Sequence, residues 1–322
     1  MDNFIIAIPS KGRVMGSTFA YLKNALRNSD IPVHVYVDQS EFAAYVEYHP
    51  EFEIIPHSKS SIGAIRRLIQ DDAAEDGNVV FMLDDDITGF YDYTGSSSVP
   101  FSEIIDSLKI LFNSYNYDLV GLHIKSNADF RMSQPPGAFF GVAYAFSPRL
   151  HELGIRFTEE QYISEDMDFS IQVALHDDEI EKTHLERRVS ADVGGADSHF
   201  GHASYTAFSI GLYRKYGNVV MLLQHMDDLG CSIDMERLDY FKTHGVVYSK
   251  GGNNALVNLY QNKFIEGGFI LEAMETCHCK KTPEGEFTYD WDYFGYDGSI
   301  GDHEALRRGH NCPYDYPAAE EA

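Results

Sequence analysis

The stretch "VVFMLDDDITGFY" (Val79–Tyr91) places a short apolar run directly before three consecutive aspartates, Asp84, Asp85 and Asp86. The apolar residues are typical of a buried strand. Three adjacent carboxylates repel one another, and a simple surface turn needs only one of them. The sequence therefore predicts that something cationic binds where this strand ends.

Strand and helix patterns alternate before this stretch, which is typical of an α/β layered fold with a mostly parallel sheet. Ser17 suits the N-cap position of the first helix, and Ser61 is near the start of the third. The predicted strands are 3–9, 33–38, 52–56 and 78–83, and the predicted helices are 17–29, 39–49 and 61–76. Ligands of such sheets bind outside the carboxyl ends of the strands, where residues 9–13, Asp38 and the three aspartates are expected.

The pattern continues beyond the aspartates with less regularity. We expect a helix at 101–115, strands at 118–125 and 138–147, a loop that becomes a helix within 159–176, a Gly-rich loop at 192–204 and a helix at 205–217. Residues after about 220 mix helical spacing with turns. We therefore predict a catalytic domain at 1–220 and a mixed helical and irregular extension at 221–322 that packs on it.

Composition limits the possible functions. The 322 residues carry a net charge of −25 with a pI near 4.8, which argues against binding nucleic acid through bulk charge but leaves room for a local basic groove. No apolar run approaches the ~18 residues of a membrane span. The N-terminal apolar run is short and lacks a preceding basic segment, so no signal peptide is predicted and a cytoplasmic location is expected.

Asp84 and Asp86 are the first candidates for metal binding. If the chain stays extended, their side chains point to the same side. Two converging carboxylates suit Mg²⁺ or Mn²⁺, which complete their ligand shells with phosphate and water. An Asx-type turn with solvated carboxylates is the alternative.

This Asp-x-Asp motif after an apolar strand resembles that of the GT-A nucleotide-sugar glycosyltransferases, and the resemblance covers about residues 3–210. It implies a GT-A-like, Rossmann-like fold and a metal held by Asp84 and Asp86 at the diphosphate of a nucleotide sugar, expected to be a UDP-sugar. The resemblance also implies that the donor is bound by the end of the first strand, the end of the second strand, the helix "GAIRR" and the motif itself: Pro9, Ser10, Lys11, Arg13, Asp38, Gly63, Arg66, Arg67, Asp84 and Asp85.

"ISEDMDF" (Ile163–Phe169) resembles the acidic pair of inverting members of that group. The resemblance implies that Asp166 is the catalytic base and that Glu165 positions the acceptor. Acids favoured by the dipole at a helix N-terminus are the alternative. The same group often adds a late histidine to the metal site, a role open to His199 or His202, although both could be ordinary loop histidines.

The segments "FIIAIPSKGR", "LDDDI" and "SEDMDF" together resemble a narrower group, the TET-associated glycosyltransferases of bacteriophages. The resemblance implies 5-hydroxymethylcytosine in DNA as the acceptor, and the host cytoplasm as the location if the chain is phage-encoded. A DNA acceptor needs basic side chains near its phosphates and aromatic side chains near its bases, although the basic side chains could equally be salt-bridged surface residues. The candidates are Lys125, Arg131, Arg187, Arg188, Arg214 and Lys215, with Tyr91, Tyr93 and Phe139.

Other functions remain open at this level. The acceptor could be a glycan or a lipid-linked sugar, although no membrane-binding segment is evident. A nucleotidyltransferase would need a Gly-rich phosphate loop, which "SKGR" is too short to supply, and a non-catalytic metal module would leave Asp166 unexplained. Cys277, Cys279, His310 and Cys312 could bind zinc, with free thiols as the alternative, because the usual two-residue gap between cysteines is missing.

Overall fold

The computed structural model describes residues 3–27, 29–124, 142–159, 164–191, 202–225, 228–234, 237–246, 279–281 and 287–289. The chain divides into two compact units, one of residues 1–160 and 165–196 and the other of 161–164 and 197–322. The predicted boundary between 220 and 221 instead falls inside the second unit, at the beginning of a strand.

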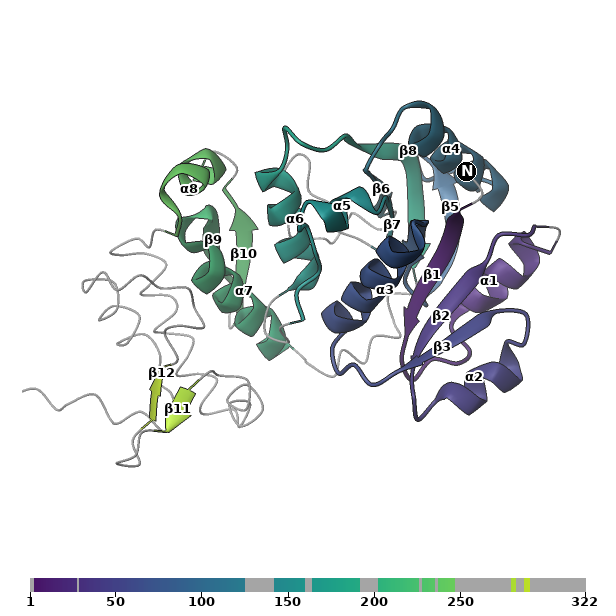
Figure 1. Ribbon diagram of the computed structural model, residues 1–322, viewed down its shortest axis with the longest axis horizontal. Coiled ribbons are helices and arrows are strands. Elements are labelled where there is room, and N and C mark those ends of the chain that lie inside the picture. The colour runs from purple at the N-terminus through teal and green to yellow at the C-terminus, as the bar shows by residue number, and fades with distance from the viewer. Residues whose placement is uncertain are drawn as a thin grey trace, which may run out of the picture. The chain divides into compact units, whose positions relative to one another are not determined.

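The first unit contains an eight-stranded mixed sheet (Figure 1). Its strands are β1 (Phe4–Ser10), β2 (Val33–Asp38), β3 (Glu53–His57), β4 (Val79–Leu83), β5 (Ile87–Asp92), β6 (Leu119–Ile124), β7 (Ala143–Phe146) and β8 (Lys182–Ala191), in the order β3-β2-β1-β4-β7-β6-β8-β5. Only β7 and β5 run antiparallel to their neighbours. The carboxyl ends of β1, β2, β3, β4, β6 and β8 therefore lie at one edge of the sheet.

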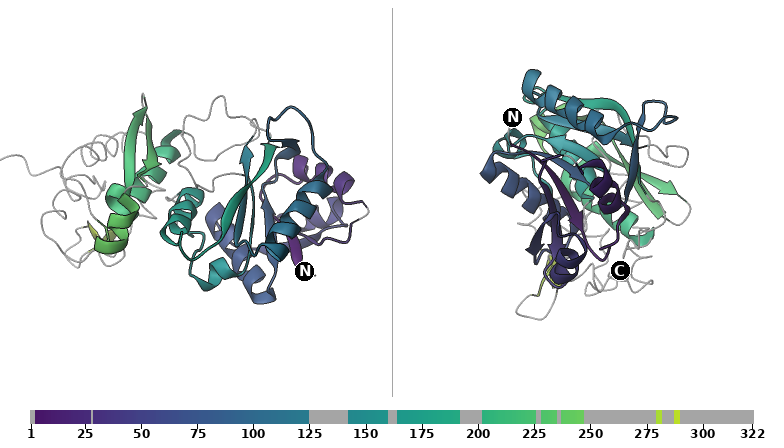
Figure 2. Two further views of the ribbon diagram at one scale, coloured as in Figure 1. Left: turned by 90° about the horizontal axis from the view of Figure 1, so that it is seen from above. Right: turned by 90° about the vertical axis from the view of Figure 1, so that its right-hand side faces the viewer.

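Helices cover both faces of this sheet (Figure 2). They are α1 (Ser17–Ala25), α2 (Phe42–Tyr48), α3 (Ile62–Asp76), α4 (Phe101–Ser114), α5 (Arg149–Glu152) and α6 (Glu165–Leu175). Residues of α1 and α4 pack on one face, and residues of α3, α5 and α6 pack on the other.

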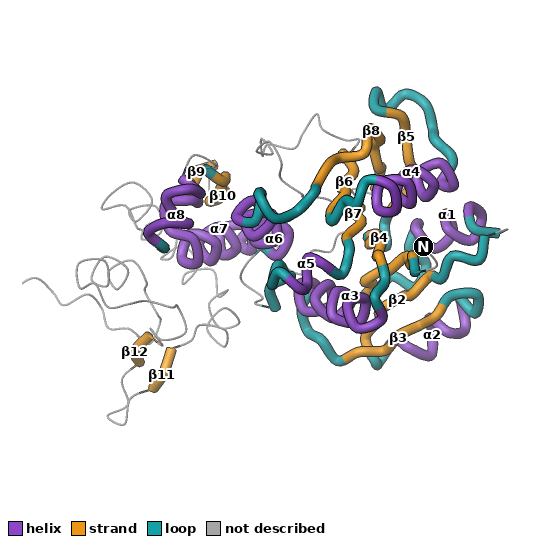
Figure 3. The backbone as a smooth tube through the Cα atoms, turned by 45° about the horizontal axis from the view of Figure 1, so that its top comes forward, coloured by secondary structure: helices purple, strands orange, loops and turns teal. Residues whose placement is uncertain are grey.

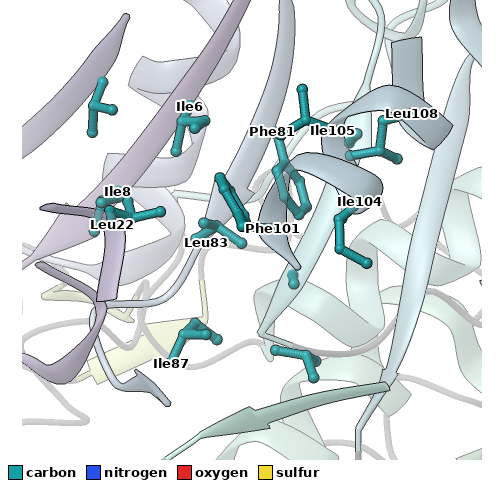
Figure 4. Packing of buried hydrophobic residues seen from close by; sticks show 14 of the residues in the cluster. Ile6, Ile8, Leu22, Phe81, Leu83, Ile87, Phe101, Ile104, Ile105 and Leu108 are labelled. Atoms are coloured by element: carbon teal, nitrogen blue, oxygen red, sulfur yellow. The ribbon is translucent and has the colours of Figure 1, made fainter. Parts of the chain in front are cut away.

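The two hydrophobic layers follow from the alternation of side chains along each strand. Ile6 and Ile8 of β1 point to the α1 and α4 side, where they join Leu22, Phe81 and Phe101 (Figure 4). Ile5 and Ala7 point to the opposite side and pack with α3 and α6. Because both faces are buried, the central strands are almost wholly apolar.

The predicted α/β fold class with a mostly parallel sheet is confirmed, with strands and helices close to the predicted positions through β4 and at α4, β6, β7 and α6. Ser61 caps α3, because its side chain accepts a hydrogen bond from the Ala64 N–H. Ser17 does not cap α1: Gly16 occupies the N-cap position and Ser17 is the first helical residue. The strands β5 and β8 and the short helix α5 were not predicted.

The second unit contains α7 (His202–Tyr216), a short 3₁₀ helix (Gly217–Val219), the hairpin of β9 (Val220–His225) and β10 (Asp228–Ile233), and α8 (Leu238–His244) (Figure 3). The last strands, β11 (Cys279–Lys281) and β12 (Phe287–Tyr289), pair antiparallel. Residues 202–204, predicted as loop, form the first turn of α7. In the part of the chain that the structure describes, no helix is long and apolar enough to cross a membrane.

Candidate functional site

The three aspartates form a turn between β4 and β5 that is attached to the beginning of α1. The Thr18 hydroxyl donates to the Asp84 carbonyl at 2.6 Å and accepts from the Ile87 N–H at 2.7 Å. A Cβ on Gly16 would lie 2.4 Å from the Asp85 carbonyl oxygen, so only glycine allows α1 to approach this closely. Because Asp85 and Asp86 lie in the turn, the chain is not extended here, and the condition for Asp84 and Asp86 to point the same way is not met.

Arg13 pairs with the second and third aspartates. Its Nη1 lies 2.9 Å from Asp85 Oδ1 and 3.2 Å from Asp86 Oδ2. Asp85 is buried and also accepts from the Ser10 hydroxyl at 2.6 Å, and this hydroxyl lies 2.7 Å from the Tyr45 hydroxyl. Burial raises the pKa of Asp85. Asp85 therefore joins the loop after β1 to the turn after β4.

Arg66 connects the first aspartate to the acidic pair on α6. Its Nη2 donates to Asp84 Oδ1 and its Nη1 donates to Glu165 Oε1, both at 2.8 Å. The guanidinium lies 5.9 Å from the centre of the Tyr144 ring, and only 6% of the Arg66 side chain is exposed. Three segments that are far apart in the sequence therefore meet at one buried cation, which we call the Arg66 cluster: Arg66, Asp84, Glu165 and Asp166.

The Arg66 cluster holds more negative than positive charge. Burial raises the pKa of Asp84 to about 6 even though Arg66 lowers it. Burial also raises the pKa of Glu165, and Asp166 adds to the effect. Removing a carboxylate from water favours its protonated form unless enough cation is present. One guanidinium among three carboxylates leaves an excess of negative charge around Arg66 when all three are ionised.

Asp166 lies in the first turn of α6, half-buried, and its Oδ1 accepts from the Met167 N–H at 2.7 Å. Gly63 is what allows α3 to lie close to this region. A Cβ at residue 63 would lie 2.1 Å from the Thr158 carbonyl oxygen and 3.1 Å from Glu165 Cβ. In this structure Gly63 thus serves close packing between α3 and the segment that leads to α6.

A pocket of about 410 Å³ opens beside the aspartate turn, lined by Gly12, Arg13, Val14, Met15, Gly16, Ser17, Asp85 and Asp86. Asp86 Oδ1 and Ser17 Oγ are buried and have no hydrogen-bond partner in the structure. Both are hard oxygen donors of the type that Mg²⁺ and Mn²⁺ prefer. The residues therefore fit a divalent cation at Asp86, with Asp84 on the other side of the turn.

Other predicted donor-site residues lie along the same edge without joining these clusters. Pro9 is buried within β1, and Lys11 is exposed after it. Asp38 ends β2, where hydrogen bonds from the hydroxyl and N–H of Ser40 lower its pKa. Arg67 points away from the aspartates and pairs with Asp71 at 3.0 Å.

The histidine and cysteine predictions stay predictions. His199 lies outside the described residues, and His202 begins α7 in the second unit. Cys277, His310 and Cys312 also lie outside them, and only the backbone of Cys279 is described, in β11. Cys231 is buried and forms no disulfide within the described residues. Within the described ranges, no three histidine, cysteine or acidic side chains are grouped as a metal site would require.

The two candidate acceptor arginines, Arg187 and Arg188, lie on β8 and not in a loop. Arg187 Nη2 pairs with Glu103 Oε1 of α4 at 2.6 Å. Arg188 Nε donates to the Tyr93 carbonyl, also at 2.6 Å, and its guanidinium lies 5.6 Å from the centre of the Tyr93 ring. Arg214 and Lys215 are on α7 in the second unit, and Lys125, Arg131 and Phe139 are outside the described residues.

Several site residues were missed by sequence reasoning: Gly16, Thr18, Tyr45 and His57. His57 ends β3 beside Asp38, and its buried Nε2 has no hydrogen-bond partner within the structure. Burial lowers the pKa of His57. None of these residues stands in a motif, because each role depends on a contact with a residue far along the chain. Only the position of His57 at a strand end could have indicated it.

Comparison with known proteins gives one family and several distant structures. The family model described as TET-Associated Glycosyltransferase matches residues 4–180, more than half of the chain. No curated protein matches the sequence.

Among solved structures, residues 1–349 of TarS from S. aureus align at 15% identity with a TM-score of 0.43, covering 84% of this chain and 74% of that one. A longer TarS structure gives the same identity and TM-score, and the alignment spans about half of it, 49%. 4-Diphosphocytidyl-2C-methyl-D-erythritol synthase from Anaerococcus prevotii aligns at 11% identity with a TM-score of 0.38, covering 65% of this chain and 98% of that one.

Proposed function

Because this chain belongs to the TET-associated glycosyltransferase family, we propose that it moves a sugar from a UDP-sugar to the hydroxymethyl group of 5-hydroxymethylcytosine in DNA. The proposed reaction needs Mg²⁺ or Mn²⁺ and inverts the anomeric centre. The observation that carries the proposal is the Arg66 cluster, in which one buried guanidinium binds both Asp84 and Glu165 at 2.8 Å. A carboxylate of the proposed donor site and the acidic pair of the proposed acceptor site are thereby held in one place.

Asp86 is the residue that would hold the divalent cation, and Asp84, which pairs with Arg66 on the other side of the turn, would join it only after the turn has rearranged. When bound, such a cation neutralises the charge that develops on a departing diphosphate. The unpartnered Asp86 Oδ1 supports this assignment, as does the excess of carboxylate over guanidinium around Asp84. Arg13 lies between Asp85 and Asp86 and adds a fixed positive charge on the side where the diphosphate would lie.

Asp166 is the proposed base. Its carboxylate takes the proton of the acceptor hydroxyl while the acceptor oxygen forms a bond to the anomeric carbon. The bond from that carbon to the diphosphate oxygen breaks, and the UDP leaves with the electron pair. Attack from the face opposite the leaving group inverts the centre. Glu165 is held by Arg66 and orients the acceptor beside Asp166.

Family membership and the cationic residue Arg188 on β8 favour DNA as the acceptor, whereas the net charge of −25 predicts weak and strongly salt-dependent binding. A glycan acceptor would use the same donor residues, so it is an outcome of the experiment below.

The test is an acceptor and metal panel read by mass spectrometry. The protein is incubated with Mn²⁺ and several nucleotide sugars, and with hydroxymethylated DNA, the same DNA with plain cytosine, or oligosaccharides. We expect one hexose or pentose mass on hydroxymethylated DNA only, and none in excess chelator. A mass gain on an oligosaccharide alone would overturn the DNA acceptor, and full transfer in chelator would remove the metal from the mechanism.

A further inference from the structure

Four side chains form a ring-rich patch on the sheet at β5, β6 and β8, which we call the stacking platform: Tyr93, His123, His184 and Arg188. The His123 and His184 rings are stacked with centres 4.9 Å apart, and Tyr93 meets His123 edge-on at 6.3 Å. Arg188 lies over the Tyr93 ring. Tyr93 is among the exposed large hydrophobic residues of the first unit, with 58% of its surface accessible to solvent.

The stacking platform is on the same face of the sheet as the Arg66 cluster. Along β6, Val120 and Leu122 point into the α1 and α4 layer, so Gly121 and His123 point to the opposite face, where Leu119 and Tyr144 also pack. Strand register places Tyr144, Gly121 and His184 side by side on β7, β6 and β8. With strands ~4.8 Å apart, the His184 backbone is ~10 Å from that of Tyr144, which lies beneath Arg66.

We propose that the stacking platform holds the unpaired pyrimidine nucleotide that carries the acceptor hydroxymethyl group. This inference rests on the proposed function and names the residues that would recognise its acceptor. The base would stack on the Tyr93 and histidine rings, and Arg188 would face a neighbouring phosphate. A target base must leave the duplex to reach such a surface, as in other enzymes that act on bases.

Charge complementarity favours a nucleotide over an uncharged sugar here. In a chain of net charge −25, a phosphate needs a cation that is not already neutralised. Arg188 binds a carbonyl and a ring, and it makes no ion pair with a carboxylate within the described residues. Burial lowers the pKa of His123, and the Arg188 charge lowers it further, so this ring stacks as a neutral imidazole at pH 7.

Arg187 provides a matched control one residue away. Its side chain is neutralised by Glu103 of α4, on the other side of the sheet from the stacking platform. The two arginines share a strand and a charge but differ in what they face. Substituting each with alanine removes the same charge from the protein, so bulk electrostatics changes equally in the two variants.

The experiment measures binding without transfer. A fluorescein-labelled single-stranded oligonucleotide with one 5-hydroxymethylcytosine is titrated with protein in the absence of a nucleotide sugar, and anisotropy is read at several salt concentrations. Tyr93→Ala should weaken binding about tenfold, whereas Tyr93→Phe, which keeps the ring, should stay within about twofold. Arg188→Ala should weaken binding and reduce the slope of log affinity against log salt by about 0.7, and Arg187→Ala should do neither. Thermal unfolding checks that every variant is folded.

Equal weakening by Arg187→Ala and Arg188→Ala, or wild-type binding by Tyr93→Ala, would overturn the stacking platform. So would a wild-type protein that binds an oligosaccharide and not the oligonucleotide. Failure of the proposed function is a separate result. It would appear in the transfer assay as no mass gain on hydroxymethylated DNA, even if the Tyr93 and Arg188 variants bind the oligonucleotide as expected. Conversely, if the Tyr93→Ala and Arg188→Ala variants transfer sugar normally with an unchanged KM for DNA, the proposed function stands and the stacking platform does not bind the acceptor.

Discussion

At the scale of single residues, the most informative side chain is Arg66, because it contacts two acidic residues that are far apart in the sequence. The resemblance implied that Arg66 binds the donor. In the structure its guanidinium is buried and donates hydrogen bonds to Asp84 and Glu165. A planar fork can bind two carboxylates at once, which a lysine ammonium cannot do with the same geometry. We therefore propose that Arg66 is a positioning residue that acts through its two acidic partners.

Arg66→Lys tests this role. We expect kcat to fall about tenfold or more with little change in the KM for the nucleotide sugar, because loss of one charged hydrogen bond costs ~1.5–3 kcal/mol. Steady-state kinetics with both substrates varied gives the two constants. Arg67→Lys, one residue away in an exposed pair with Asp71, should change neither constant. A raised donor KM with unchanged kcat would instead make Arg66 a donor contact.

Asp166→Asn separates the base from its neighbours. The amide keeps the size and the hydrogen bond to Met167 but cannot take a proton as a carboxylate does. Turnover should fall by about 10² or more, and binding of the nucleotide sugar, measured by calorimetry, should be nearly unchanged. Loss of donor binding with turnover retained on the bound donor would make Asp166 a binding residue and would remove the support for inversion.

At the scale of elements, sequence reasoning succeeded where the hydrophobic period is regular and failed where it is broken. The strands β1 to β4 are apolar runs between helices with clear faces, so their positions along the chain and the shared edge at their carboxyl ends could be predicted. In β8, "KTHLERRVSA", the apolar residues Leu185 and Val189 are four apart, which looks helical. A spacing of four also keeps two residues on one face of a strand. Here the polar Arg187 lies between them, and the pairing with β6 shifts register between Leu122 and His123. A bulge of this kind leaves no signal in the sequence.

The same limit explains the partial prediction of the site. The Asp motif, Arg66 and Glu165 could be named because each stands in a recognisable segment. Their ion pairs could not be predicted, because α3 and α6 are about 90 residues apart in the sequence and come together only in the folded sheet. Thr18 and Tyr45 were missed for the same reason: each supports the aspartate turn from a helix with no motif of its own.

Gly63→Ala tests how closely α3 must approach the segment before α6. Alanine is the better helix former by ~1 kcal/mol, so propensity alone predicts stabilisation. We expect the opposite, a loss of ~2 kcal/mol or more in urea unfolding, because the new methyl would meet the Thr158 carbonyl, which is backbone and cannot rotate away. Gly89→Ala is the control, since its Cβ would meet only the Tyr91 ring at 3.6 Å or beyond. Equal or greater stability of Gly63→Ala would show that the two segments can separate at little cost.

At the scale of the whole molecule, acidity dominates. A net charge of −25 repels both DNA and further carboxylates, so each cation at the sheet edge has a large local effect. The first unit concentrates two of them, Arg13 and Arg66, at the turn after β4, where three aspartates lie together. Even there the carboxylates outnumber the cations, and this local excess should be visible in the pH dependence of stability.

Asp84 gives that dependence a definite sign. Its pKa is raised to about 6 in the folded protein, above the ordinary value of 3.8, so the folded state binds more protons between these values. Stability contributed by protonated Asp84 is therefore present at about pH 4 and lost as the pH rises through 6. Two pKa units would give at most ~3 kcal/mol, but a quarter of the side chain is exposed, so we expect ~1 kcal/mol.

Asp84→Asn isolates this contribution, because it keeps an oxygen for Arg66 but does not titrate. Urea unfolding is measured for both proteins in chelator between pH 4.5 and 7.5. We expect the wild type to lose ~1 kcal/mol relative to the variant as the pH rises over this range. The lowered pKa values of His49 and His57 act in the opposite direction, but they are common to both proteins and cancel in the difference. A difference that stays constant, or that favours the wild type as the pH rises, would mean that Arg66 keeps Asp84 ionised and that the Arg66 cluster has no excess charge for a divalent cation to neutralise.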